Sequence, residues 1–213
     1  MSRSRRRSAC RRPSTYGAPL ISDTRRAASS GGFGMTFDKQ PTLTGAYVGV
    51  RPLRRSDYDA LYAVASDPLL WEQHPVPSRC EEGEFRRFFE ESLASGGALL
   101  VEDLETGEVI GSTRFHGYSE ERGEVEIGWT FLARSHWGGK YNGDLKAIMA
   151  QHAFKFVAAI ILFIDTENIR SRLAAERIGA VAEPGLDENG RMIFRLHRTL
   201  TKTLAHKQTN GRA

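Results

Sequence analysis

The sequence predicts a mixed α/β domain, in which helices pack on a single sheet, and three observations support this. Residues 123–131 alternate between apolar and polar side chains, which is the period of a strand with one buried face. A turn with Gly138 and Gly139 then opens a stretch whose apolar residues recur with helical period. The apolar run 159–166 follows. A strand, a helix and a second strand form one crossover unit, so we expect these two strands to lie parallel.

The strand and the helix of this unit form the centre of the predicted fold. The buried strand face should carry the four apolar residues Val125, Ile127, Trp129 and Phe131, and Glu124 and Glu126 should point the other way. The helix should bury one stripe, formed by Tyr141, Leu145, Ile148, Met149, His152 and Phe156. Free N–H groups and the positive end of a helix dipole meet where a glycine turn opens a helix, so this turn predicts an anion site.

The preceding residues supply the other antiparallel strands and two helices. The fold should begin near Ala46, with a strand over 47–53 and a helix that Ser56 and Asp57 open. A proline-broken loop over 67–77 leads to a second helix over 81–95, whose first turn is acidic, as the helix dipole favours. Residues 96–115 indicate a hairpin, and 116–123 a turn into the central strand.

The last elements complete the sheet. The run 159–166 is apolar throughout, which indicates a strand buried on both faces. A helix over 168–180 should turn Ile169, Leu173 and Ile178 inward and close at Gly179. A final strand is expected over 191–200. An antiparallel meander that continues into a parallel crossover makes the sheet mixed.

The positive charge of the chain is concentrated at its start. Residues 1–34 carry eight arginines against one acid, a net charge of +7, whereas the whole chain of 213 residues has +4. The remainder therefore has −3, and the basic pI says nothing about its binding face. We expect 1–34 to be a disordered basic tail or to precede the true start at Met35, 35–203 to be one domain, and 204–213 to be a polar tail.

Other function classes are disfavoured by composition. The two cysteines, Cys10 and Cys80, have no metal or redox spacing, and no metal site is expected. No apolar run approaches the roughly 20 residues of a membrane span. The N-terminal arginines are not followed by the apolar stretch of a secretory signal, so we expect a cytoplasmic protein.

The order of elements and four segments resemble the GNAT superfamily of acyl-CoA-dependent N-acetyltransferases, nearest the ribosomal-protein N-terminal (Rim-type) branch. The resemblance covers about residues 46–200, and its carriers are EIGWTFL (126–132), RSHWGGKYN (134–142), HAF (152–154) and ENIRSRLAAERIGA (167–180). It implies a GNAT-like sheet with splayed central strands and acetyl-CoA as co-substrate. The loop departs from the family pattern Q/R-x-x-G-x-G/A at two positions. This chain has Ser135 where the pattern has Gln or Arg, and Lys140 where it has the final Gly or Ala.

The resemblance places coenzyme A on the turn and on the helix after the second parallel strand. Backbone N–H groups of the turn should hold the pyrophosphate, with charge from Arg134 and Lys140, and Asn168 should bind the pantetheine arm. The full expected cofactor set is Phe131, Leu132, Arg134, Trp137, Gly138, Gly139, Lys140, Tyr141, Asn142, Asn168, Ser171 and Arg172.

Two residues are candidates for proton transfer. Acetyl transfer needs a neutral amine, so a base must accept its proton, and the departing thiolate benefits from an acid. Glu126, with Glu124 in reserve, is the candidate base, and the alternative is a strand carboxylate paired with an arginine. Ser171 is the candidate acid, as the resemblance implies, and the alternative is a residue of the first helical turn. Asn168 could equally be an ordinary N-cap.

Three functions remain open at this stage. The first is an N-acetyltransferase acting on a small amine or a protein N-terminus by direct attack in a ternary complex, since no cysteine is near the site. The second is a catalytically silent CoA-binding module, and the third is nucleic-acid binding through the basic tail, which we do not expect. Trp71, His74 and Tyr118 should border the acceptor site, while His136 is expected to be solvated and Trp137 to pack. No membrane partner is expected, and a homodimer is left open.

Overall fold

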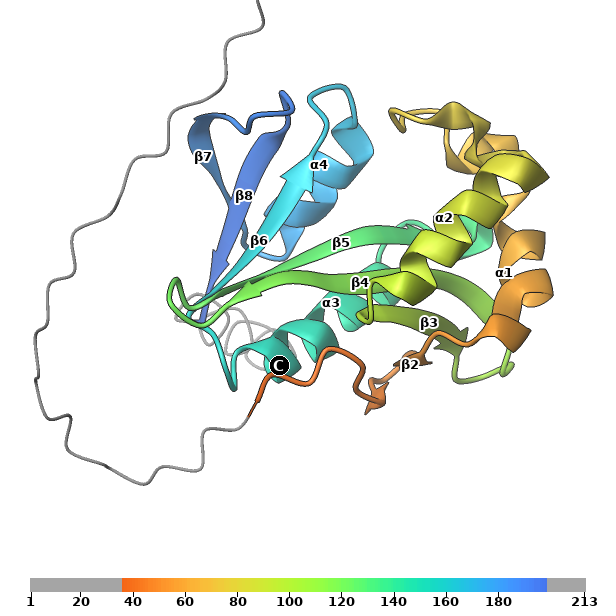
Figure 1. Cartoon of the computed structure of the whole chain (residues 1–213), viewed down its shortest axis with the longest axis horizontal. Coiled ribbons are helices and arrows are strands. Elements are labelled where there is room, and N and C mark those ends of the chain that lie inside the picture. The colour runs from red at the N-terminus through yellow and green to blue at the C-terminus, as the bar shows by residue number, and fades with distance from the viewer. Residues whose placement is uncertain (1–35, 199–213) are drawn as a thin grey trace, which may run out of the picture. The chain divides into compact units, whose positions relative to one another are not determined.

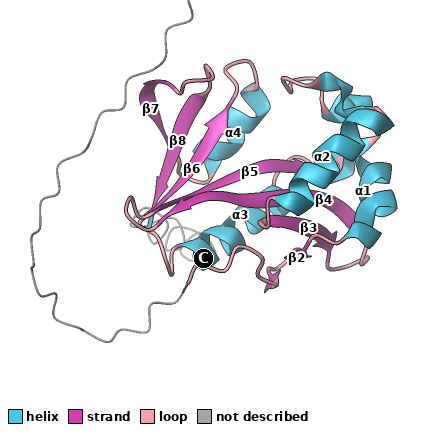
Figure 2. Cartoon of the chain, viewed as in Figure 1, coloured by secondary structure: helices cyan, strands magenta, loops and turns pink. Residues whose placement is uncertain are grey.

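The computed structural model describes residues 36–198, and our expectations for residues 1–34 and 204–213 lie outside these described residues. An eight-stranded sheet runs through the described domain (Figures 1 and 2). Its spatial order is β1 (Leu43–Thr44), β2 (Val48–Pro52), β3 (Ala98–Asp103), β4 (Val109–Ser119), β5 (Glu124–Leu132), β6 (Ala159–Ile164), β8 (Met192–His197) and β7 (Val181–Leu186). The helices are α1 (Tyr58–Ala65), α2 (Glu82–Ala94), α3 (Lys140–Ala153) and α4 (Ile169–Arg177).

Four short 3₁₀ turns link these elements: Arg55–Asp57, Pro68–Leu70, Pro77–Cys80 and Arg134–His136. The mixed α/β sheet is therefore confirmed. Strand β4 runs to Ser119, so the expected turn over 116–123 is wrong in its first half. Strand β7 was not expected, because its residues are largely exposed and do not alternate.

The two central strands pair in parallel over a short length and then separate. Their register joins Glu124 to Ala159, Val125 to Ile160 and Glu126 to Ile161. Beyond this point β5 pairs only with β4, and β6 only with β8. Figure 1 shows β6, β8 and β7 turning away from β2 to β5 as a second arm. The expected splayed parallel pair is thus confirmed.

A β-bulge interrupts the alternation of β5. Trp129 has φ 49, the one positive φ of a non-glycine residue in the described domain. The register to β4 slips there, because Ser112 faces Phe131 while Arg114 faces Gly128. One extra residue in a strand moves every later side chain to the opposite face. The expectation that Trp129 and Phe131 share a face with Val125 and Ile127 is therefore wrong.

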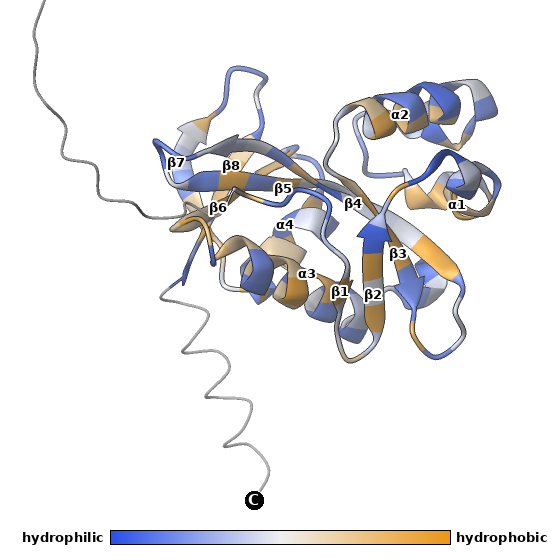
Figure 3. Ribbon diagram, turned by 60° about the horizontal axis from the view of Figure 1, so that its bottom comes forward, coloured by the Kyte–Doolittle hydropathy of each residue, from blue (hydrophilic) through white to orange (hydrophobic). Residues whose placement is uncertain are grey.

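Two apolar cores lie on the two faces of the sheet. The first packs under α3 and contains Val125 and Ile127. The second packs under α1 and α2 and contains Phe131. Strand β3 serves both, since Leu99 belongs to the first core and Leu100 to the second. Figure 3 shows apolar colour on the strands between the helical layers, as expected for a sheet covered on both faces.

The expected stripe of α3 is largely confirmed, but two other expectations about packing are wrong. The buried stripe includes Leu145, Met149 and His152. In α4, however, Ile169 and Leu173 are exposed, and Ala175 is the buried residue. Ile178, just after α4, is partly buried and packs against the first core, so this part of the expectation is confirmed.

The fold begins earlier than Ala46. Phe37 is 4% exposed and belongs to the first core. Its ring stacks on Tyr118 at a centroid distance of 4.9 Å and meets Phe115 edge-on at 5.3 Å. The carbonyl of Asp38 accepts a hydrogen bond from His152 Nε2 at 2.7 Å. The segment before β1 therefore closes one end of the core.

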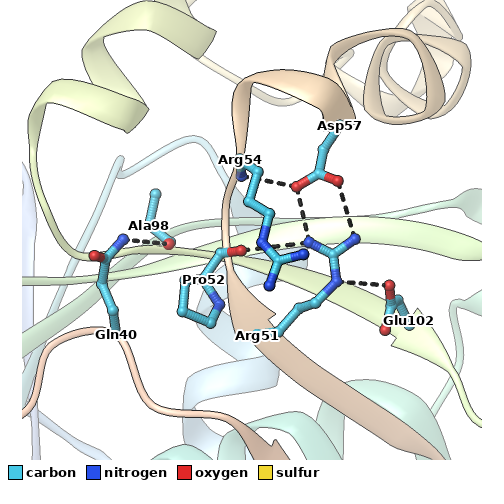
Figure 4. A network of polar contacts seen from close by, with 7 residues as sticks. All are labelled: Gln40, Arg51, Pro52, Arg54, Asp57, Ala98 and Glu102. Atoms are coloured by element: carbon cyan, nitrogen blue, oxygen red, sulfur yellow. Dashed lines mark hydrogen bonds and ion pairs between the residues drawn. The ribbon is translucent and has the colours of Figure 1, made fainter.

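Two polar anchors tie the N-terminal strands to the rest. Arg51 on β2 donates two hydrogen bonds to Asp57 and one to Glu102 on β3 (Figure 4). Burial acts to raise the pKa of Asp57, but the Arg51 hydrogen bonds and the Arg54 amide outweigh it and hold the pKa below its usual value. The Asp144 carboxylate of α3 accepts the backbone amides of Ala46, Tyr47 and Val48.

Within the described part of the chain, no helix is both long and apolar enough to cross a membrane.

Replacing Phe37 tests the early start of the fold. We expect Phe37→Ala to lower the free energy of unfolding by roughly 3 kcal/mol or more, because it removes a buried ring. Urea titration followed by tryptophan fluorescence measures this. The control Leu104→Ala, at a side chain that is 47% exposed, should change stability by less than about 0.5 kcal/mol. Equal stability of the two variants would contradict the assignment.

Candidate active site

A continuous cleft follows the separation of β5 and β6. Its inner part is a cavity of about 350 Å³ that reaches Glu126 on β5 and Asp165 after β6. Its outer part has a similar volume and reaches the loop 136–139 before α3. The two parts share a wall, formed by Trp71, His74, Thr130, Phe131, Asn142, Asn168, Ser171, Ala174 and Ile178.

The start of α3 presents a row of free backbone donors to the outer part. The amides of residues 138–142 have no acceptor among the described residues, whereas that of Trp137 is bonded to the Arg134 carbonyl at 3.1 Å. Gly138 and Gly139 have φ values of 92 and 152, and added Cβ atoms would meet nothing within 4 Å. The first turn of α3 carries no acidic residue, so the positive end of its dipole is uncompensated. This geometry fits a diphosphate.

Four predicted cofactor residues do not line the cleft: Arg134, Lys140, Tyr141 and Arg172. Arg134 is bonded to Asp67, and Lys140 lies over the rings of Tyr47 and Tyr141. Arg172 donates to the Thr166 carbonyl at 3.0 Å. Each of these three cations is thus held by another group of the protein.

The other predicted residues do line the cleft. They are Glu126, Phe131, Leu132, Trp137, Gly138, Gly139, Asn142, Asn168 and Ser171.

Trp137 and His136 have fixed places in the loop. Trp137 donates from Nε1 to the Leu132 carbonyl at 2.8 Å, and the Arg170 guanidinium lies 3.9 Å from its ring centroid. These two contacts hold the Trp137 ring in place, although it is 37% exposed and belongs to neither apolar core. His136 is only partly exposed, and its Nε2 lies 3.1 Å from the Asp103 carboxylate, so the expectation of a solvated ring is wrong.

Glu126 is poised to exchange a proton near neutral pH. It is the last residue of β5 that pairs with β6, at the point where these two strands separate, and it lines the inner cavity. Burial raises its pKa to about 7, against the lowering effect of the Arg191 and Arg114 charges. In the described domain no arginine or lysine forms an ion pair with it, so the paired-carboxylate alternative fails. The reserve residue, Glu124, is paired with Arg195 at 3.3 Å.

Ser171 and Asn168 stand together at the start of α4. The Asn168 side chain accepts the backbone amide of Ser171 at 3.1 Å, so Asn168 is the N-cap of this helix. Both residues line both parts of the cleft. The Ser171 hydroxyl makes no hydrogen bond to another described residue, and it remains free to act on a ligand.

A buried lysine lies beneath the cleft, and the sequence reasoning did not single it out. Lys146 on α3 is 8% exposed and lines the inner cavity. Its Nζ donates to the Thr130 hydroxyl at 2.7 Å, and Thr130 also meets the Thr113 hydroxyl at 2.8 Å. Burial lowers the pKa of Lys146 to about 7. The i, i+4 spacing from Asn142 was the available signal, since such residues share a helix face.

The wall opposite the loop residues comes from the segment between α1 and α2. Trp71 is buried, and its Nε1 donates to the Ala65 carbonyl at 2.8 Å. His74 packs edge-on against it at 5.4 Å. Both border the inner cavity, together with Arg79, which no sequence pattern marked. Tyr118, expected at the same border, instead stacks on Phe37 in the core.

The splayed parallel pair and the glycine turn before α3 form an open cleft that can take a phosphorylated cofactor. Residues 48–181 match the family model described as "Acetyltransferase (GNAT) domain", and the chain belongs to this family. It is therefore an acetyltransferase fold suited to acetyl-CoA. No curated protein matches the sequence.

Solved structures of this fold resemble the chain closely in shape and weakly in sequence. A GCN5-related N-acetyltransferase from Brucella melitensis has a TM-score of 0.69 and 19% identity, covering 80% of this chain and 86% of its own. A probable acetyltransferase from Chromobacterium violaceum has a TM-score of 0.66 and 18% identity, covering 84% of this chain and 97% of its own. Mycobacterium smegmatis RimJ, solved in complex with CoA-disulfide, has a TM-score of 0.62 and 16% identity, covering 79% of this chain and 95% of its own.

The described residues contain no group of three or more His, Cys, Asp or Glu side chains placed to bind a metal ion.

Substitution of Lys146 tests its unusual environment. The pKa of Lys146 is 10.5 in the unfolded chain and about 7 in the folded chain. Unfolding therefore lets the amine gain a proton at neutral pH, and this lowers the free energy of unfolding. The destabilisation fades as the pH rises toward 10, where the amine is largely neutral in both states. We expect Lys146→Met to raise the free energy of unfolding by about 4 kcal/mol at pH 7. Urea titrations at pH 7 and 10 should show the gap shrinking.

The exposed Lys155 is the matched control, because Lys155→Met removes the same charge without a buried site. A Lys146 variant whose advantage stays constant or grows with pH would contradict the assigned environment.

Proposed function

We propose that this protein is an acetyl-CoA-dependent N-acetyltransferase that transfers the acetyl group to a primary amine by direct attack in a ternary complex. The observation that carries the proposal is that Gly138, Gly139 and Asn142, whose amides are free, line the same cleft as Glu126. One end of the cleft suits a diphosphate, and the other holds a carboxyl group with pKa near neutrality. Acetyl-CoA, when bound, supplies an activated acetyl group as a thioester.

The cofactor end would bind CoA mainly through the backbone. Amides 138–142 would hold the pyrophosphate, and Asn142 would brace the turn from the first turn of α3. The backbone of β5 around Phe131 and Leu132 would meet the pantetheine arm, with the Leu132 carbonyl already accepting a hydrogen bond from Trp137. Arg134 and Lys140 would add charge after leaving Asp67 and the tyrosine rings, and the remaining members of the set, Tyr141 and Arg172, would support the loop and α4.

The chemistry at the acceptor end would depend on two proton transfers. Glu126 would accept a proton from the ammonium group of the acceptor, directly or through water, so that the neutral amine can attack the thioester, since a group with a pKa near the working pH exchanges protons efficiently. Ser171 would donate to the departing sulfur, because its hydroxyl is free and lies at the start of α4, where the two parts of the cleft meet.

Direct transfer is favoured over an acyl-enzyme. Within the described residues no thiol lines the cleft, and the Cys80 thiol is directed to the Pro77 carbonyl. The structural likeness to RimJ supports a Rim-type acceptor, such as a protein N-terminus, and a small amine fits the same chemistry. We propose that the protein acts in the cytoplasm, where acetyl-CoA is made.

The glycine turn can be tested by binding alone. We expect calorimetric titration to show micromolar affinity for acetyl-CoA and CoA. Gly138→Val should weaken both at least tenfold, because a β-branched residue does not adopt a φ of 92 and the amide row would tilt. Gly96→Val imposes similar strain at φ 62 in another turn and should retain affinity. Unchanged CoA binding in the Gly138 variant would remove the turn from the site.

The base is tested by Glu126→Gln, which keeps the shape and removes the proton acceptor. We expect kcat to fall about 100-fold or more, with no change in acetyl-CoA affinity. Glu126 acts only when deprotonated, so wild-type kcat should decline as pH falls below about 7, and the variant should lose this decline. Near-normal kcat in the variant, measured by CoA release, would exclude Glu126 as the base.

A further inference from the structure

We propose that the acceptor amine also carries an anionic group, a carboxylate or a phosphate, and that Arg79 binds this group. The inference rests on the proposed function, since it concerns the acceptor end of the same cleft. Nothing in the general chemistry of acetyl transfer requires such a charge. The arginines around this cleft lack the acid partners that would neutralise them, and this points to a bound anion.

Arg79 is placed as a ligand-binding cation. It lies in the turn Pro77–Cys80, is partly exposed and lines the inner cavity that Glu126 also faces. Its guanidinium carbon stands 4.7 Å from the ring centroid of Phe88 and 5.7 Å from that of Trp71. Both rings are buried and fixed. Within residues 36–198 no carboxylate lies at ion-pair distance from Arg79, and its one polar neighbour is His74.

The contact with His74 leaves one donor without an acceptor. His74 Nδ1 lies 2.9 Å from the amide of Val76, and Nε2 lies 2.9 Å from Arg79 Nη1. Burial lowers the pKa of His74 to about 4, so the ring is neutral and carries one N–H. If Nδ1 accepts from Val76, the proton is on Nε2 and faces the Arg79 donor. If the proton is on Nδ1, the Val76 amide faces a donor instead. The cluster is short of one acceptor, and a bound anion would supply it.

A second arginine adds positive potential behind this wall. Arg114 is 5% exposed, donates to the Ser92 hydroxyl at 2.6 Å and stands 4.3 Å from the Trp129 ring centroid. Its Nε is buried without a partner, and burial lowers its pKa to about 10. The exposed Glu91 acts on both arginines only through space. Glu126 also acts on Arg114 through space, but neither arginine forms an ion pair with a described acid. Buried guanidinium groups without an ion-pair partner are rare, so this region attracts negative charge.

The other charges of the cavity suit the ammonium end of such an acceptor. Glu126 and Asp165 both line it, and Asp165 is bonded only to the nearby amide of Glu167, at 2.9 Å. Arg191 also lines the cavity, but Asp187 holds it at 2.7 Å. Among the described residues, Arg79 is thus the one guanidinium that lines the inner cavity without an acid partner, since Arg170 and Arg177 line only the outer part. A zwitterion would place its ammonium group toward the carboxylates and its anion on Arg79.

The experiment compares matched amines on the full chain saturated with acetyl-CoA. The probes are glycine, β-alanine and γ-aminobutyrate with their amides, and phosphoethanolamine with ethanolamine. CoA release gives kcat and KM. We expect kcat/KM for the anionic member of at least one pair to exceed that of its neutral partner at least tenfold. The pair in which this occurs distinguishes a carboxylate from a phosphate.

Variants at Arg79 locate the preference. Arg79→Gln should raise KM for the anionic probe at least tenfold, leave kcat within about threefold and remove the preference, while Arg79→Lys should retain part of it. Arg87→Gln, at an exposed residue of α2 bonded to Glu84, should match the wild type. A wild type that prefers the neutral members, or an Arg79→Gln variant that loses both members equally, would overturn the inference.

Binding separates this inference from the proposed function. Calorimetry with the CoA-loaded protein measures affinity for each probe without turnover. If the anionic probes bind in an Arg79-dependent way and no probe is acetylated, the anion site stands and the proposed transfer fails. If anionic and neutral probes bind equally, the anion site fails, whatever the activity.

Discussion

The separation of β5 from β6 is the constraint on which the rest of the structure depends. Parallel strands that remain paired use their backbone N–H and C=O groups in hydrogen bonds to each other, so no ligand can enter between them. Here pairing stops at Glu126 and Ile161, and each strand continues with a different antiparallel neighbour. Backbone polar groups on the newly exposed edge need other partners. The Leu132 carbonyl finds one in Trp137, which also fixes the loop that leads to α3.

Burial gives the inner cavity two groups that titrate near neutrality from opposite directions. Burial raises the pKa of the Glu126 carboxyl to about 7, because the charged form loses its water. Burial lowers the pKa of the Lys146 amine to about 7 for the same reason. The bulge at Trp129 contributes to this arrangement. By moving Thr130 to the α3 face it provides the hydroxyl that Lys146 contacts, and it leaves Glu126 on the face that opens into the cleft.

The sequence predicted what local pattern controls. Alternation, helical period and glycine placement were sufficient for the sheet, the crossover and the turn at Gly138. They were not sufficient where one residue changes the register, because the bulge at Trp129 has no signature of its own. Strand β7 was missed because it is exposed on both sides. Arg79 was missed because a loop without periodicity gives no direction to its side chains, and Lys146 because a lysine on a helix usually points to solvent.

The hydrogen bonds that the Asp144 carboxylate accepts from the amides of Ala46, Tyr47 and Val48 affect the order in which the domain folds. They join positions about a hundred residues apart, a separation of 96 to 98 along the chain. Contacts between distant residues form slowly, because a long loop must close before they are gained. The start of α3, with its row of amides, is therefore positioned only when the first strands have docked. CoA would find no partial site on a half-folded chain, and its binding free energy would stabilise only the finished domain.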